Sequence, residues 1–172
     1  GARGRVESSG TFATMGVPPG RYFVRVSGAP QGWTFHSAMV NGRDASVFPV
    51  ELESSDISGV VVSFTDRPTE IAGDITAENA APETVTVLVF PSDANAWTGY
   101  GNSSRQFASA RVGKDGKFRI PNLPAGDYLA VAMPDSQAAD WQNPKFLQGL
   151  TGAATRIRLR DGDKITQNLK VI

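Results

Sequence analysis

The chain has 172 residues, and its 17 lysines and arginines balance 17 aspartates and glutamates, so its formal net charge at pH 7 is zero. A neutral chain has no long-range field to recruit nucleic acid or anionic lipid. The absence of cysteine excludes disulfides, thiolate zinc sites and cysteine nucleophiles, and no apolar run reaches the roughly 20 residues that a membrane-spanning helix needs.

Short strand-like runs fill the first 66 residues. Val, Thr and Phe recur between turn signals in a chain with 18 glycines and 11 prolines, which is typical of all-β proteins. Residues 5–7 are expected to pair with residues 10–17. Asn41-Gly42 predicts a tight hairpin turn, because both residue types accept a positive φ. Residues 57–64 are predicted to be a closing strand, and residues 65–70, with a central proline, form a short and stiff connector.

Several further strands are predicted in the second part of the chain. Residues 71–76 and 84–90 are expected to be its opening strands, separated by a polar turn. Residues 107–112 lead into Lys114-Asp115-Gly116, which predicts a hairpin turn before the next strand at Phe118.

The pattern becomes helical beyond Met133. Trp141, Leu147 and Leu150 follow a helical spacing, a proline fits the first turn, and Asn143 is the expected cap. We expect this helix to cover the second apolar face of the strand that begins at Tyr128.

An imperfect repeat organises the whole chain. Residues 10–26 match residues 116–132 without a gap, and the matching positions are Gly10/Gly116, Phe12/Phe118, Val17/Leu123, Pro18/Pro124, Gly20/Gly126, Tyr22/Tyr128 and Val26/Ala132. A repeat at an offset of 106 residues indicates repeated domains, because solenoid units are about 20 to 50 residues long. The ends of the copies also match, with Val50 and Leu52 opposite Ile157 and Leu159.

Each copy predicts strand, turn and strand. Phe118 and Ile120 alternate with charged residues, which is the pattern of a half-buried strand. Pro124 presets the turn, and Gly126 is expected to accept a positive φ. The tyrosine at the start of the second strand is expected to bond its hydroxyl back to the turn, as in the tyrosine corner of Greek-key sandwiches.

The Gly-x-Phe-x-Ile-x-x-Leu-Pro-x-Gly-x-Tyr pattern at residues 116–128 resembles the carboxypeptidase regulatory-like domains, relatives of transthyretin-like and Cna-B-type sandwiches. The fold-defining residues of the two copies are Phe12, Pro18, Gly20, Tyr22, Phe118, Pro124, Gly126 and Tyr128. The resemblance implies tandem Ig-like or transthyretin-like antiparallel β-sandwiches, with one short helix in the second. It divides the chain into the C-terminal part of a sandwich (1–66), a linker (67–70) and a complete sandwich (71–172), so the first domain is expected to be truncated. It also implies a bacterial protein at an extracellular, cell-surface or periplasmic location.

No catalytic, cofactor-binding or metal-ligating residue is predicted. His36 is the only histidine and is interpreted as an ordinary strand residue, the alternative being a proton or metal role. Asp115, Asp161 and Asp163 lie beside glycines, where aspartate is expected to bond within turns. A single histidine does not supply a usual triad.

Three functional hypotheses follow. The first is a non-catalytic structural module of an exported bacterial surface protein, a stalk, spacer or assembly unit whose partners are neighbouring sandwich domains. The second is a carbohydrate- or surface-binding module that uses Trp97 and Tyr100. The alternative for Trp97 is that it folds back as a lid over the end of the sandwich. Nearby, Asn102 matches a glycosylation sequon. The third is a filament subunit completed by strand addition from a neighbour.

Overall fold

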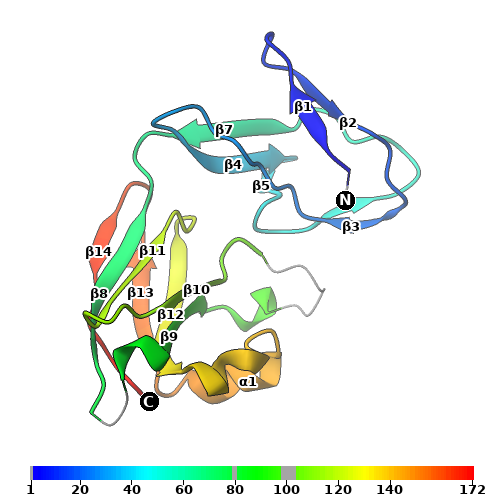
Figure 1. Cartoon of the computed structure of the whole chain (residues 1–172). Helices are drawn as coiled ribbons and strands as arrows, with labels where there is room; N and C mark the ends of the chain where they lie inside the picture. Colours follow the sequence, from blue (N-terminus) through cyan, green and yellow to red (C-terminus); the bar gives the residue numbers. More distant parts are fainter. Residues whose placement is uncertain (1, 79–80, 98–103) are drawn as a thin grey trace.

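A computed structural model describes residues 2–78, 81–97 and 104–172. The chain is an all-β protein with one short α-helix, as the sequence predicted. Its strands pair in two separate groups, which we call the N-terminal unit (β1 to β7) and the C-terminal unit (β8 to β15). Figure 1 shows the two units one above the other, joined where β7 leads into β8.

The N-terminal unit contains seven short strands. They are β1 (Gly4–Val6), β2 (Phe12–Thr14), β3 (Gly20–Tyr22), β4 (Thr34–Val40), β5 (Arg43–Asp44), β6 (Val50–Leu52) and β7 (Val61–Thr65). β1 pairs with β2, β3 with β6, and β4 lies between β5 and β7, all antiparallel. The hairpin turn between β4 and β5 is confirmed, with φ of 48° at Asn41 and 77° at Gly42. β7 begins at Val61 and not at Ile57, so the predicted closing strand is shorter than expected.

The C-terminal unit is a sandwich of two sheets. The first contains β10 (Ala108–Arg111), β9 (Val85–Pro91), β12 (Gly126–Pro134) and β13 (Thr155–Leu159) in this order. The second contains β11 (Lys117–Pro121), β8 (Glu70–Thr76) and β14 (Lys164–Thr166), and β15 (Leu169–Lys170) also pairs with β8. Alternate residues of both sheets meet in one core that includes Ile71, Val87, Phe118 and Tyr128.

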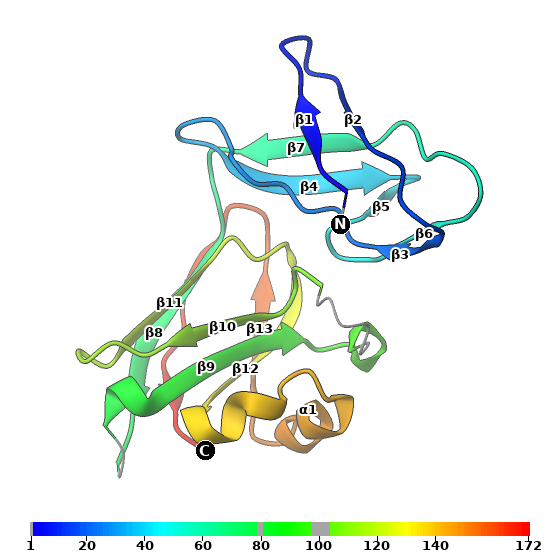
Figure 2. The ribbon, with the colours of Figure 1, turned by 45° about the vertical axis from the view of Figure 1, so that its right-hand side comes forward.

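A second apolar layer covers the outer face of the first sheet, and Figure 2 shows α1 lying beside that face. The α-helix α1 (Pro144–Leu150) begins at Asn143, whose side chain accepts a hydrogen bond from the Lys145 N–H, as expected for the cap. Leu147 of α1 packs on Leu129, Val131 and other residues of β9 and β12. The predicted covering role of this helix is confirmed. The remaining helices are the short 3-10 segments η1 (Pro82–Thr84), η2 (Ala94–Ala96) and η3 (Asp135–Asp140).

The two copies of the repeat have the same strand register. Gly20 and Tyr22 pair with Leu52 and Val50. In the C-terminal unit, Gly126 and Tyr128 pair with Leu159 and Ile157, which the repeat matches to Leu52 and Val50. The tyrosine hydroxyls donate to the turns as expected, from Tyr22 to the Pro18 carbonyl at 2.6 Å and from Tyr128 to the Pro124 carbonyl at 2.5 Å.

Two predictions about turns were wrong. Neither Gly20 nor Gly126 has a positive φ, and the left-handed residue of the second turn is Asn122, with φ of 60°. Lys114-Asp115-Gly116 does form a tight turn, but the strands that flank it belong to different sheets. This turn therefore carries the chain across the sandwich instead of closing a hairpin. None of the helices in the described ranges is long and apolar enough to span a membrane.

Candidate functional site

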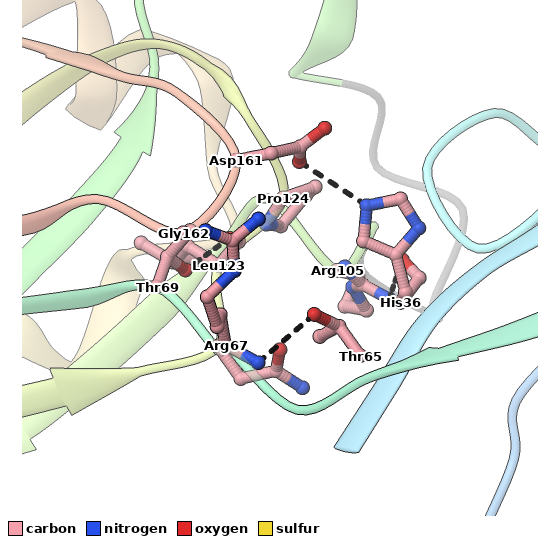
Figure 3. A pocket seen from close by; sticks show the side chains of 10 residues that line it. His36, Thr65, Arg67, Thr69, Arg105, Leu123, Pro124, Asp161 and Gly162 are labelled. Carbon is pink, nitrogen blue, oxygen red and sulfur yellow. Dashed lines mark hydrogen bonds and ion pairs between the residues drawn. The ribbon is translucent and has the colours of Figure 1, made fainter. Parts of the chain in front are cut away.

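The junction between the two units holds a small polar cavity of about 70 Å³ (Figure 3). Its walls come from β4 and the connector on one side and from loops of the C-terminal unit on the other. Its lining includes His36, Arg67, Thr69, Arg105, Asn122 and Asp161. The site is created by the way the two units meet, so neither unit contains it alone.

Arg105 anchors the C-terminal unit to β4. Its Nη1 donates to the His36 carbonyl oxygen at 2.7 Å, and its backbone N–H donates to the Ser46 carbonyl oxygen at 3.0 Å. Its guanidinium carbon lies 4.7 Å from the centre of the Phe35 ring, which is cation–π geometry. Burial lowers the pKa of Arg105, while the nearby Asp44 carboxylate acts in the opposite direction. The buried Nε has no hydrogen-bond partner among the described residues, so part of the cost of burial is left uncompensated.

Asn122 makes a second bridge. Its Nδ2 donates to the Phe35 carbonyl oxygen at 3.1 Å, and its backbone N–H donates to the Thr69 carbonyl oxygen at 2.7 Å. The left-handed backbone at this position favours asparagine or glycine. Thr69 is buried in the connector and donates from Oγ1 to the Leu123 carbonyl oxygen at 2.5 Å. The connector is therefore fixed to the same turn that bridges to β4.

His36 and Asp161 make the third bridge. The Nε2 atom of His36 lies 3.1 Å from Oδ1 of Asp161, and Figure 3 shows the two side chains pointing toward each other. A break in the β4–β7 register between Phe35 and Ser37 leaves His36 out of the ladder, and such a bulge redirects a side chain. Both side chains are more than one-third exposed, so the interaction adds little stability by itself.

The structure separates the roles of the two neighbouring aspartates. Asp163 accepts the Arg160 backbone N–H at 2.9 Å, which is the turn bonding that the sequence suggested. Asp161 instead faces the N-terminal unit. The interpretation of Asp161 as a turn residue missed this contact, and so did the interpretation of His36 as an ordinary strand residue. No group of three His, Cys, Asp or Glu side chains in the described ranges is placed to hold a metal ion.

Trp97, a predicted ligand residue, lies in the interior. Its side chain is packed against Phe90 in an edge-to-face arrangement with ring centres 5.6 Å apart, and its Nε1 donates to the Pro91 carbonyl oxygen at 2.7 Å. Only 6% of Trp97 is exposed. Tyr100 and Asn102 lie outside the described residues, so the ligand-binding role of Trp97 and Tyr100 stays a prediction.

Sequence reasoning did not select Arg105 or Asn122. Arg105 follows a polar loop without periodicity, and its role depends on a surface of the other unit. Asn122 carried a weak signal, because asparagine before Leu-Pro in a turn is a common left-handed residue. That signal predicts the backbone conformation but not the contact with Phe35.

No family model and no curated protein matches this chain. Similar solved structures include a DUF3823 family protein from Bacteroides ovatus, with 16% identity, a TM-score of 0.36 and coverage of 59% of this chain and 42% of that one. A second DUF3823 family protein, from Parabacteroides merdae, has 19% identity, a TM-score of 0.35 and coverage of 60% and 45%. A streptococcal ancillary pilin has 15% identity, a TM-score of 0.35 and coverage of 94% and 47%. The chain spans less than half of each of these proteins, and none of the similarities bears on what it does.

Proposed function

We propose that this chain is a non-catalytic structural module that holds its two β units at a fixed angle within an exported bacterial surface protein. The observation that carries the proposal is the junction, where Arg105 reaches into the N-terminal unit through two hydrogen bonds and a ring contact. A stalk or spacer needs this property, because its neighbours must keep their separation and direction. Membership of the carboxypeptidase regulatory-like domains, suggested by the repeated motif, is part of the same proposal.

The connector supports a fixed geometry. β7 ends at Thr65 and β8 begins at Glu70, so few residues separate the units. Within this stretch the Arg67 backbone N–H donates to Thr65 Oγ1 at 3.1 Å, and the Glu70 N–H donates to the Asp163 carbonyl oxygen at 2.9 Å. A short connector bonded to the sandwich has few conformations, whereas a flexible linker has many.

His36, the only histidine of the chain, takes part in the junction. His36 contacts Asp161, its carbonyl oxygen accepts from Arg105, and its position results from the bulge in β4. A His–Asp pair between two units is suited to orienting them. This role requires neither a substrate nor a nucleophile nearby.

Small-angle X-ray scattering tests the proposal. We expect the intact chain to scatter as a single conformation with a defined maximum dimension. The double variant Arg105→Ala, Asn122→Ala removes two of the three side-chain bridges, leaves only the exposed His36–Asp161 pair, and is expected to scatter as a mixture of interdomain angles. A wild-type profile that already requires a broad mixture contradicts the proposal.

A second candidate function, saccharide binding, is favoured by a groove of about 250 Å³ on the C-terminal unit. Trp141 forms one side of this groove, and Asp135 accepts a hydrogen bond from Thr86 and lies 3.4 Å from Arg111. An aromatic ring beside a few fixed polar groups suits a sugar ring. On a glycan array, Arg111→Ala is expected to abolish any binding at this groove, and Arg119→Ala, in the other sheet, to preserve it. Binding that survives Arg111→Ala contradicts this second candidate.

A further inference from the structure

The junction cavity is lined by more positive than negative side chains. Its lining contains the guanidinium groups of Arg67 and Arg105 and the carboxylate of Asp161. Protonation of His36, which also lines the cavity, adds a further positive charge. The Asp161 carboxylate already has a partner, because its Oδ1 lies 3.1 Å from Nε2 of His36. The cavity therefore presents two arginines and a single carboxylate that a histidine contacts.

Arg67 holds the fold through its backbone, and its side chain lines the cavity. The Arg67 N–H donates to Thr65 Oγ1 at 3.1 Å. The connector passes so close to the neighbouring loop that a Cβ added at Gly162 would lie 3.7 Å from the Arg67 Cβ, and Figure 3 shows the Arg67 side chain extending toward this loop. Within residues 2–78, 81–97 and 104–172, no carboxylate forms an ion pair with its guanidinium. This positive charge is therefore free to meet a ligand.

Arg105 brings a second positive charge, whose hydrogen bonding is incomplete. Its Nη1 donates to the His36 carbonyl oxygen at 2.7 Å, but its buried Nε has no partner in the described part of the chain. The nearby Asp44 carboxylate is engaged elsewhere, because its Oδ1 accepts from the backbone N–H groups of Ala38 and Ser46 and from the Ser46 hydroxyl. A buried charged group with incomplete pairing costs free energy. An anion beside Arg105 would offset this cost.

The size of the cavity restricts the ligand to a small group. Its volume of about 70 Å³ exceeds what one water molecule needs and is far below the about 300–1,000 Å³ of pockets for drug-sized ligands. The side chains of His36 and Asp161 are 40% and 68% exposed, so a ligand can enter from solvent on their side. Thr65 and Asn122 add a hydroxyl and an amide that can donate hydrogen bonds. A compact group with several acceptor oxygens fits this lining.

We propose that the junction cavity binds a phosphate or sulfate group between Arg67 and Arg105. Guanidinium groups match such oxyanions because their planar N–H donors bond to two oxygens at once. The cavity exists only where the two units meet, so the anion binds the closed junction and stabilises it. This inference gives the junction a ligand, and it rests on the closed junction that the proposed function also requires.

Amide NMR spectra of the full chain, titrated with sodium sulfate at constant pH and ionic strength, test the proposal. We expect saturable shifts at the amides of Arg67, Asn122 and Gly162, which line the cavity. Arg67→Ala keeps the backbone hydrogen bond to Thr65 and loses the guanidinium, so it is expected to weaken sulfate binding about tenfold.

Two further variants separate a site from a general effect of charge. Asp161→Asn removes the lining carboxylate but keeps an acceptor for His36, so it is expected to strengthen sulfate binding about threefold. Arg156→Ala is the matched control for Arg67→Ala. Arg156 is exposed on β13 outside the cavity lining, so the variant makes the same change in net charge and is expected to bind sulfate as the wild type does.

Shifts that do not saturate, or equal weakening by Arg67→Ala and Arg156→Ala, overturn the proposal, because the cavity then holds only water or sulfate acts through net charge. Titrations with inorganic phosphate and with glycerol 3-phosphate distinguish two sources of the group. Equal affinities assign the site to a phosphate carried by a larger molecule, a preference for inorganic phosphate assigns it to the free ion, and both results support the site. Scattering without added sulfate or phosphate tests the fixed junction separately, so failure of the anion site and failure of the proposed function are distinguishable.

Discussion

Replacement of Arg105 by alanine is expected to release the junction. The substitution removes the hydrogen bond from Nη1 to the His36 carbonyl oxygen and the contact with the Phe35 ring. The backbone hydrogen bond from residue 105 to Ser46 remains available to alanine. The units therefore stay connected but lose their main side-chain anchor.

The size of the effect follows from three contributions. A hydrogen bond from a charged donor contributes about 1.5–3 kcal/mol. The cation–π contact adds about 0.5–2 kcal/mol. The buried, unpartnered Nε of Arg105 opposes these gains by about 1–3 kcal/mol, and alanine removes that cost. We expect a net loss of about 2 kcal/mol, which raises the ratio of open to closed junctions about thirtyfold.

Spin-label distance measurements report this change directly. The chain has no cysteine, so labels at Ser54→Cys in the N-terminal unit and Gln148→Cys in the C-terminal unit react without interference. Both side chains are exposed, and neither lies at the junction. We expect one narrow distance distribution for the labelled protein and a broad one after Arg105→Ala.

Arg111→Ala is the matched control, because Arg111 is 80% exposed and pairs with Asp135 within the C-terminal unit. The control distribution is expected to stay narrow. If Arg105→Ala also leaves the distribution narrow, the side-chain hydrogen bond and ring contact of Arg105 do not set the angle between the units, contrary to the expectation.

Three further predictions concern stability. Tyr128→Phe is expected to lower the free energy of unfolding by about 1–3 kcal/mol in chemical denaturation, because the half-buried Pro124 carbonyl loses the donor that the buried tyrosine supplies. Tyr22→Phe is expected to lower it by about 0.5–1.5 kcal/mol, because the hydrogen bond of Tyr22 is more exposed. Equal costs would contradict the difference in burial. Burial raises the pKa of Tyr128 above its ordinary value of 10.0. As the pH rises above 10.0, the Tyr128 hydroxyl therefore loses its proton more readily in the unfolded state than in the folded state, and the free energy of unfolding falls. The Tyr128→Phe variant has no hydroxyl at this position, so it is expected to lack this part of the decrease. Gly73→Ala is expected to lower the free energy of unfolding by about 1–3 kcal/mol or more, because the added Cβ would lie 2.0 Å from the Gln167 carbonyl oxygen. The control Gly149→Ala places its Cβ in open space on a helix, so in thermal melts this variant is expected to be as stable as the wild type or more stable.

Local chemistry made much of the fold predictable. The repeat predicted that the segments around Tyr22 and Tyr128 share one local structure, and in both of them the tyrosine hydroxyl bonds to its turn. The shared strand register was found in the structure. Asn143 and the apolar spacing after it predicted α1 and the face that it covers. These features depend on residues close in sequence or on matching copies, which a sequence displays directly.

The sequence was less informative where distant surfaces meet. The turn at Lys114-Asp115-Gly116 fixes a local reversal, but the sheet that receives the next strand is decided by packing against β8. His36 reaches Asp161 only because of a bulge and the placement of another unit. Arg105 lies in a segment without any pattern. The division into domains at residues 67–70 stays a prediction. If it is right, a fragment of residues 67–172 alone is expected to fold and to unfold cooperatively without the N-terminal unit.

Residual dipolar couplings test the fixed junction most directly. They are recorded for the backbone amides of the intact chain in a weakly aligning medium, and the couplings of each unit are then fitted separately. We predict that one alignment tensor fits residues 34–65 and residues 70–172 together. Two tensors of different magnitude would show that the units move independently, which would contradict a role for this chain in holding its neighbours in place.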